Sequence, residues 1–301
     1  MSTVSATPPS AGVVESVLSW YDVHARDLPW RRRETTPWAV LVSEVMLQQT
    51  PVSRVLPAYA TWLARWPTPT AQAVDPPGEA VRAWGRLGYP RRALRLHQAA
   101  TDIMVRHGGR VPSSYDGLRA LPGVGDYTAA AVATFAFRQR HAVVDTNVRR
   151  VLARLLDGAE FPPGAGVTAA DRRLAASLLP TEPAVAARWA VALMELGALV
   201  CTARAARCDV CPLADRCAWR GAGRPSYAGP PRRRQAYAGT DRQVRGELLA
   251  VLRASPGPVT AATLAGALPD PDQGARALAG LIADGLVEVL PPQRYRLPQR
   301  G

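Results

Sequence analysis

The chain has 301 residues, of which 48% are hydrophobic and 20% charged, a composition that indicates a globular protein of one or two domains with a sizeable core. It carries 37 basic residues against 24 acidic ones, a net charge of +13, and because it contains no lysine, all 37 are arginines. The charge favours a polyanionic partner such as nucleic acid, although arginine-rich coding alone could produce it. The absence of lysine excludes a side-chain amine that forms a Schiff base.

Helical patterning dominates the chain from residue 12 to residue 222. Residues 1–11, rich in Ser, Thr, Pro and Ala, predict a disordered tail. Apolar residues then share one helical face in three segments, 13–21, 96–103 and 148–155. Since no alternating strand pattern precedes the last fifteen residues, the main body is predicted to be all-α.

The C-terminal part differs from the main body in composition. Residues 223–240 are rich in Gly, Pro and Arg and predict a linker. In 241–301 three short helical patterns precede two strand candidates, 287–290 and 295–297, which could pair as a hairpin. Three helices and a hairpin indicate a small winged-helix-like α+β unit.

No targeting signal or membrane span is visible in the sequence. There is no apolar run of about 18 residues, and residues 1–10 lack a basic-then-apolar signal layout. We expect a cytoplasmic protein that is not associated with a membrane.

All four cysteines lie within one stretch of 17 residues, spaced C-x6-C-x2-C-x5-C: Cys201, Cys208, Cys211 and Cys217. Four thiols this close, in a chain with no other cysteine, favour one multidentate centre over disulfides. Four thiolates without histidine fit a [4Fe-4S] cluster. A zinc site and unliganded structural thiols are the alternatives, but structural zinc sites usually have two close cysteine pairs, and only one is present here.

The segment Leu121-Pro-Gly-Val-Gly125 joins two apolar helical stretches. Gly123 and Gly125 allow a sharp turn that exposes backbone N–H groups at the start of a helix near Asp126, where the helix dipole also favours an anion. This pattern is typical of a helix-hairpin-helix that holds a DNA phosphate without reading sequence. A plain turn between two helices is the simpler alternative.

Two carboxylates stand out. Glu44 lies in a helical segment that is apolar on nearly every side, where burial favours the neutral acid, unless an arginine satisfies it. Asp145 precedes an amphipathic helix that begins at Asn147 and is a natural N-cap, where backbone donors keep a carboxylate ionised. One protonated and one ionised carboxylate suit cleavage of an N-glycosidic bond.

Together, these motifs resemble the endonuclease III superfamily of helix-hairpin-helix DNA glycosylases. Within it, the sequence is most similar to the A/G-specific adenine DNA glycosylases, the MutY family. The resemblance covers residues 12–222 and implies a mainly α, two-lobed fold with an iron–sulfur loop. The similar segments are RDLPWR (26–31), SEVMLQQT (43–50), LGY (87–89), LPGVGDYTA (121–129), NVRRVLAR (147–154) and MELGALVCT (194–202).

The resemblance also implies catalytic roles. Glu44 would protonate adenine N7 and then act as a base towards water. Asp145 would stabilise or trap the C1′ cation, supported by Asn147 and Tyr127. Tyr127 occupies the position at which the lyases of the superfamily carry their Schiff-base lysine, so no lyase activity is expected.

Further positions would contact the DNA. Gln49 and Tyr89 would wedge into the base stack while the adenine is flipped out. Four residues would line the adenine pocket: Arg26, Trp30, Arg31 and Glu195. For Trp30 and Glu195, simple packing and a helix-surface charge are the alternatives.

The sequence departs from the family pattern at three places. Thr146 replaces a glycine, and Pro90 replaces an aromatic residue. The Nudix-like domain that contacts 8-oxoguanine in well-known members has no visible match, and residues 241–301 take its place. We therefore expect a monofunctional glycosylase that removes adenine mispaired with 8-oxoguanine or guanine in duplex DNA, with the preferred opposite base left open. A T:G mismatch glycosylase and a non-enzymatic iron–sulfur redox sensor are the rival hypotheses.

Overall fold

The computed structural model describes residues 11–229, 237–266, 268 and 270–299. The expected N-terminal tail lies outside these residues apart from Ala11, which begins the first helix. Among the described residues, no helix is long and apolar enough to cross a membrane. The chain forms two compact units: unit 1 comprises 1–40, 113–119 and 125–231, and unit 2 comprises 41–112, 120–124 and 232–301.

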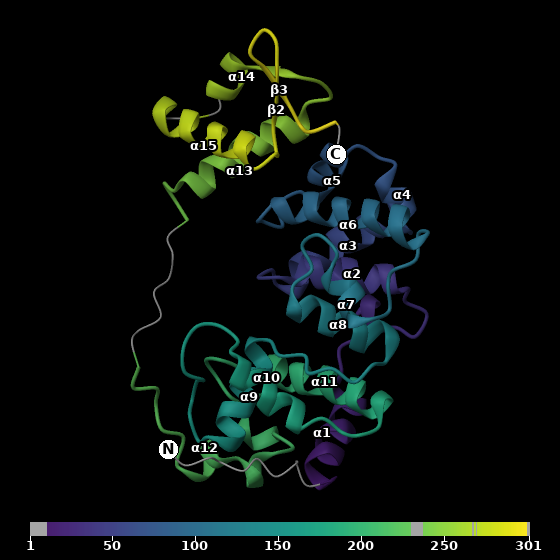
Figure 1. Cartoon of the computed structure of the whole chain (residues 1–301). Helices are drawn as coiled ribbons and strands as arrows, with labels where there is room; N and C mark the ends of the chain where they lie inside the picture. The colour runs from purple at the N-terminus through teal and green to yellow at the C-terminus, as the bar shows by residue number, and fades with distance from the viewer. Residues whose placement is uncertain (1–10, 230–236, 267, 269, 300–301) are drawn as a thin grey trace. The chain divides into compact units, whose positions relative to one another are not determined.

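Unit 1 is helical throughout its described part (Figure 1). The helix α1 (Ala11–His24) packs against α11 (Pro183–Leu199), far away in the sequence, and α11 packs against α9. The remaining elements are η1 (Pro29–Arg31), α7 (Tyr115–Arg119), α8 (Asp126–Phe137), α9 (Thr146–Leu156), α10 (Ala169–Ser177), η2 (Cys208–Val210), η3 (Ala214–Arg216) and α12 (Ala218–Gly221).

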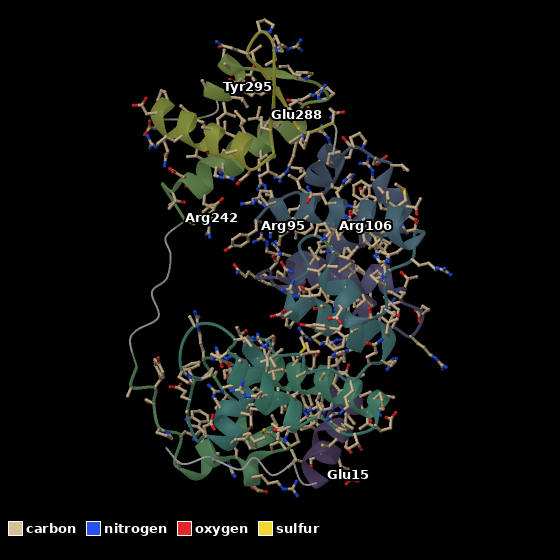
Figure 2. The ribbon with its side chains drawn as sticks, in the orientation of Figure 1. Glu15, Arg95, Arg106, Arg242, Glu288 and Tyr295 are labelled. Atoms are coloured by element: carbon tan, nitrogen blue, oxygen red, sulfur yellow. The ribbon has the colours of Figure 1, made fainter. Side chains whose placement is uncertain are left out.

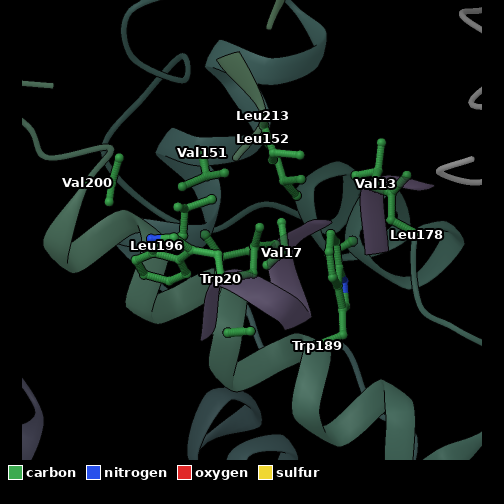
Figure 3. Close-up of a cluster of buried hydrophobic side chains, with 14 of the residues drawn as sticks. Val13, Val17, Trp20, Val151, Leu152, Leu178, Trp189, Leu196, Val200 and Leu213 are labelled. Carbon is green, nitrogen blue, oxygen red and sulfur yellow. The ribbon is translucent and has the colours of Figure 1, made fainter. Parts of the chain in front are cut away.

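The apolar faces predicted for 13–21 and 148–155 meet in the core of unit 1. Val17 of α1, Val148 and Leu152 of α9, and Trp189 and Leu196 of α11 belong to one buried cluster (Figure 3). Burial of large aliphatic and aromatic side chains contributes about 1.5–3 kcal/mol each. This core therefore fixes the start of α9, where Asp145 is located.

The first part of unit 2 packs around tryptophans. Trp62 makes edge contacts with Trp66 and Trp84, with ring centroids 4.6 and 5.7 Å apart. The helices of this part are most of α2 (Pro37–Leu47), α3 (Val52–Arg65), α4 (Pro69–Ala73), α5 (Pro77–Trp84) and α6 (Arg91–His107). The predicted 96–103 face is buried here, as part of α6.

The C-terminal part of unit 2 contains three helices and three short strands among its described residues. The helices are α13 (Asp241–Ala254), α14 (Ala261–Ala265) and α15 (Pro271–Ala283), and the strands are β1 (Val259–Thr260), β2 (Glu288–Leu290) and β3 (Arg294–Arg296). The sheet is antiparallel with the order β1-β3-β2. Tyr295, which Figure 2 labels, lies on the central strand and pairs with Val259 on one side and Val289 on the other. The strand β1 was not predicted, because two residues are too few to form an alternating pattern.

Close contacts join this C-terminal part to α5. The backbone N–H of Gly78 donates to the carbonyl of Pro298 at 2.7 Å. A Cβ at Gly78 would lie 2.4 Å from that carbonyl oxygen, so the close approach requires glycine. Arg82 donates to the carbonyl of Arg253, and Arg253 Nε donates to the carbonyl of Val81 at 2.9 Å.

Residues 223–240, expected to be a linker, begin with a segment that packs on unit 1. Trp219 Nε1 donates to the carbonyl of Pro225 at 2.9 Å, and Tyr227 N–H donates to Glu160 at 2.7 Å. Residues 230–236 lie outside the described part of the chain.

Candidate functional site

Asp145 is the N-cap of α9, which begins at Thr146, one residue earlier than predicted. One carboxylate oxygen accepts from Val148 N–H at 2.7 Å, and the other accepts from Asn147 Nδ2 at 2.7 Å. Asp145 and Asn147, paired by the sequence hypothesis, are therefore in direct contact. Both carboxylate oxygens are held in a fixed orientation.

Burial and hydrogen bonding shift the pKa of Asp145 in opposite directions. Desolvation raises the pKa of Asp145, while the hydrogen bonds from Val148 and Asn147 and the charge of Arg150 lower it; the net shift is upward. The sequence analysis predicted backbone donors that keep this carboxylate ionised. The donors are present, but burial has the larger effect on the pKa, and the sequence does not report how deeply the cap is buried.

Arg150 extends this hydrogen-bonded group towards the cysteine loop. Its guanidinium donates to Asn147 Oδ1 at 2.8 Å, to the carbonyl of Gly197 at 2.6 Å and to the carbonyl of Cys201 at 2.8 Å. A Cβ at Gly197 would lie 2.7 Å from the Cβ of Asn147, so glycine permits the close approach of α9 and α11. The sequence analysis missed Arg150, which is one of many arginines without a distinctive pattern.

Arg26, Arg31 and Glu195 form a second polar group of unit 1. Glu195 is fully buried; Arg26 Nε and Nη2 donate to its two oxygens at 2.7 Å each, and Arg31 Nη2 donates at 2.8 Å. Burial favours the protonated acid, but the hydrogen bonds from the two arginines lower the pKa of Glu195 to about 2. The alternative interpretation of Glu195 as a helix-surface charge is therefore wrong.

This group leaves one donor available. Arg31 Nη1 is buried and has no hydrogen-bond partner within the described part of the chain. A buried donor without an acceptor is costly, and a bound ligand atom would satisfy it. The neighbouring Trp30 is buried in η1. Tyr127 lies on α8 and packs against Ala130, Ala131, Val143 and Ala190.

Glu44 lies in the middle of α2, which has the apolar character predicted for it. Its side chain belongs to unit 2 and is only 5% exposed, between the fully buried Leu41 and Met46. The sequence prediction of a buried acid in this helix is confirmed.

Gln49 and Tyr89 share an unusual backbone conformation. Both are exposed, and both have positive φ, 55° for Gln49 and 48° for Tyr89. Residues other than glycine rarely adopt this region, which costs on the order of 1–3 kcal/mol and is concentrated at ligand-contacting sites. The sequence gives no sign of this conformation.

The predicted hairpin needs glycine at only one of its two positions. Gly123 has φ 78°, and a Cβ there would lie 2.7 Å from the Cβ of Arg95, which Figure 2 labels. Gly125 has an ordinary φ of −90°, caps α8 and has open space where a Cβ would be. Asp126 begins α8 as predicted and is paired with Arg119 at 2.6 Å.

The four cysteines line one common pocket of unit 1 with Arg154 and Trp219. Arg154 Nη1 lies 3.3 Å from Cys201 Sγ, and its guanidinium stacks on Trp219 at 4.4 Å from the ring centroid. No group of three or more His, Cys, Asp or Glu side chains in the described ranges is arranged to hold a single metal ion.

Four arginines lie in or beside this loop: Arg204, Arg207, Arg216 and Arg220. Arg204 and Arg207 are exposed. Arg220 is paired with Asp215 at 3.1 Å, and the guanidinium of Arg216 packs close to Gly12 of α1. Only the first two therefore retain the character of a phosphate-binding surface.

Comparisons with known proteins agree with this architecture. Residues 42–167 match the family model of HhH-GPD superfamily base excision DNA repair proteins. Over 287 residues the chain is 55% identical to the adenine DNA glycosylase of Mycobacterium tuberculosis, covering 95% of this chain and 93% of the relative. For the enzyme of Mycolicibacterium smegmatis the identity is 53%, with 95% and 96% covered. A solved thermostable thymine-DNA glycosylase matches with TM-score 0.63 and 28% identity, covering 70% of this chain and 95% of the other.

The fold and the family model define a helix-hairpin-helix DNA glycosylase of base excision repair, which confirms the class of enzyme predicted from the motifs. Within that class, the chain belongs to the adenine DNA glycosylase family. This membership favours an enzyme over the non-enzymatic redox sensor.

Proposed function

We propose that the protein is a monofunctional glycosylase that removes adenine paired with 8-oxoguanine or guanine in duplex DNA. The observation that carries this proposal is Glu44, a buried acid in an otherwise apolar stretch of α2. A carboxylic acid at this position would supply the proton that a purine leaving group requires. The protein would act as a monomer on the bacterial nucleoid.

In the proposed reaction Glu44 donates its proton to adenine N7. The bond between C1′ and N9 then breaks, its electron pair leaves with adenine, and C1′ becomes an oxocarbenium-like cation. Asp145, held by Val148 and Asn147, supplies the negative charge that stabilises this cation. Water adds to C1′ with Glu44 as the base, so the products are free adenine and an abasic site.

We assign recognition of the flipped adenine to the group formed by Arg26, Arg31 and Glu195. The orphaned Arg31 Nη1 supports this assignment, because adenine ring nitrogens are acceptors that could pair with it. Glu195 keeps both arginines oriented. Trp30 then contributes packing.

An excision assay tests the proposed function. Duplexes with A opposite 8-oxoguanine, guanine and cytosine, together with a T:G duplex, are incubated with excess enzyme, and alkali-labile abasic sites are measured. We expect release of adenine opposite 8-oxoguanine and guanine only. Removal of thymine would instead favour the activity named for the thymine-DNA glycosylase that shares the fold.

We propose that Cys201, Cys208, Cys211 and Cys217 hold a [4Fe-4S] cluster. Their common pocket and the contact between Arg154 and Cys201 Sγ fit a centre of four thiolates with net negative charge. When bound, the cluster would serve as a structural clamp. It would hold the loop that presents Arg204 and Arg207 to DNA phosphates.

Protein purified without oxygen is expected to be brown and to contain about four irons per chain. Iron and zinc are measured together by elemental analysis. A Cys208→Ser variant should lose most of the iron, whereas Ser177→Ala, outside the loop, should keep it. Stoichiometric zinc without iron would overturn the assignment.

We also expect the enzyme to release the base without cutting the DNA strand. Since the chain has no lysine, β-elimination lacks the amine that forms its Schiff base. Borohydride trapping on an A:8-oxoguanine duplex should give no covalent adduct beyond a weak background from the N-terminal amine. A stoichiometric adduct at an internal residue would contradict this.

For residues 241–301 we propose a winged-helix-like unit that stabilises the enzyme. The contacts of Gly78 and Arg82 with this unit support a stabilising role. A phosphate-binding role has less support, because Arg296 on the hairpin is paired with Glu288 at 2.9 Å. Arg276 and Arg294 remain exposed.

A further inference from the structure

Arg92 lies between the two turns that carry Gln49 and Tyr89. It is only 8% exposed and lies in the first turn of α6, three residues after Tyr89. Its guanidinium stacks beside the rings of Trp84 and Tyr89, at 5.2 and 5.4 Å from their centroids. The buried guanidinium of Arg92 contacts both turns, whereas Gln49 and Tyr89 themselves are exposed.

On one side, Arg92 binds the end of α2. Nη1 donates to the carbonyl of Val45 at 2.9 Å and to that of Gln48, the residue before Gln49. Carbonyls in the last turn of a helix lack intrahelical donors, and a cation there is favoured by the helix dipole. Arg92 therefore fixes the backbone from which Gln49 departs.

On the other side, Arg92 binds the turn of Tyr89. Nη2 donates to the carbonyl of Gly88 at 3.0 Å and to Thr50 Oγ1 at 3.2 Å. The Thr50 hydroxyl is in turn 3.2 Å from the carbonyl of Leu87. One guanidinium thus binds Gly88, which precedes Tyr89, and also Gln48 and Thr50, which flank Gln49.

These contacts account for the left-handed backbone at both exposed positions. Such conformations persist only where the surrounding structure holds them. A planar guanidinium has five N–H donors in a fixed fork, so it can bond several carbonyls at once, which the ammonium of lysine cannot do in the same geometry.

We propose that Arg92 is a positioning residue that holds Gln49 and Tyr89 in the conformation that wedges into DNA. This inference rests on the proposed function, in which these two side chains enter the base stack. Insertion of a side chain must offset the cost of unstacking, a few kcal/mol per step. Turns that already have the inserted conformation avoid the additional cost of ordering them on the DNA.

The test measures base flipping separately from chemistry. A duplex carries 2-aminopurine at the target adenine opposite 8-oxoguanine, and its fluorescence rises when the base is unstacked. The parent protein is the Glu44→Gln variant, which should flip the base without releasing it. Arg92→Met is compared with Arg253→Met, a matched control. Burial lowers the pKa of both guanidiniums to about 10, but Arg253 Nε donates to the carbonyl of Val81 on α5 and not to the turns of Gln49 or Tyr89.

We expect both variants to lose thermal stability, because each leaves buried carbonyls without a donor, but only Arg92→Met to lose flipping, by about tenfold or more. Arg92→Lys should not restore flipping. Thr50→Val is the milder variant in case Arg92→Met fails to fold; it removes one hydroxyl and should reduce flipping by about threefold.

Failure of the positioning role of Arg92 and failure of the proposed glycosylase function give different results. Normal flipping by Arg92→Met or Thr50→Val, or an equal loss in Arg253→Met, would overturn the positioning role while the wild-type protein still excises adenine. A wild-type protein that releases no adenine would overturn the proposed function, and the inference with it.

Discussion

Glu44→Gln is expected to lower the single-turnover rate of adenine release by at least about 100-fold, the usual effect of removing a general acid. Glutamine has nearly the same shape and keeps a carbonyl acceptor, with an NH2 group in place of the second oxygen, but it cannot deliver a proton to N7. Because Glu44 lies in the buried interior of α2, the substitution leaves the exposed DNA-contacting residues unchanged. Binding to an A:8-oxoguanine duplex should therefore stay within about threefold of the parent.

A control for this experiment lies in the same unit. Glu79→Gln alters a carboxylate that forms partly exposed ion pairs with Arg65 and Arg82, and it should leave the rate of adenine release unchanged. A Glu44→Gln rate within about threefold of the parent would remove Glu44 from the proposed mechanism.

Asp145→Asn is expected to abolish measurable excision and to raise thermal stability at neutral pH. The expected loss of activity, about 100-fold or more, follows from the proposed role of Asp145, whose negative charge would stabilise the C1′ cation. The gain in stability follows from burial, which raises the pKa of Asp145 and makes its ionised form costly in the folded protein. Asparagine can still accept from Val148 N–H, so α9 keeps its cap.

The stability that Asp145→Asn gains over the parent should depend on pH. A carboxyl whose folded pKa is raised contributes stability below its unfolded pKa and loses it as the pH rises through the folded value. The difference in Tm between Asp145→Asn and the parent should therefore be small at low pH and grow with increasing pH, by about 2–4 °C for each kcal/mol. A variant that is less stable than the parent at pH 8 would contradict the buried-charge argument.

Patterns of neighbouring residues predicted most of the helices and several site residues correctly. The faces at 13–21, 96–103 and 148–155 contribute buried residues to the core, as predicted. They were predictable because the 3.6-residue spacing of apolar residues can be read directly from the sequence. Glu44 was also predictable, since a single acid in an apolar helix is visible without any tertiary contact.

The same patterns could not predict which partners a charged side chain binds or how deeply it is buried. The sequence contains 37 arginines, and nothing local distinguishes Arg92 or Arg150, which lie against buried carbonyls, from exposed residues such as Arg204. Glu195 was ambiguous for the same reason, because its two arginines come from a segment about 165 residues away. Sequence patterns report which face of a helix is apolar, whereas these roles depend on long-range contacts.

The contacts between α5 and the C-terminal part of unit 2 have a consequence for the chain between them. Because Gly78, Arg82 and Arg253 meet through hydrogen bonds within one molecule, the covalent connection keeps the two partners at a high effective concentration. A single cleavage of the chain between residues 229 and 237 would leave these hydrogen bonds intact but make the association bimolecular. The two fragments should then separate on dilution, so that the stability of the nicked protein, unlike that of the intact one, would depend on its concentration.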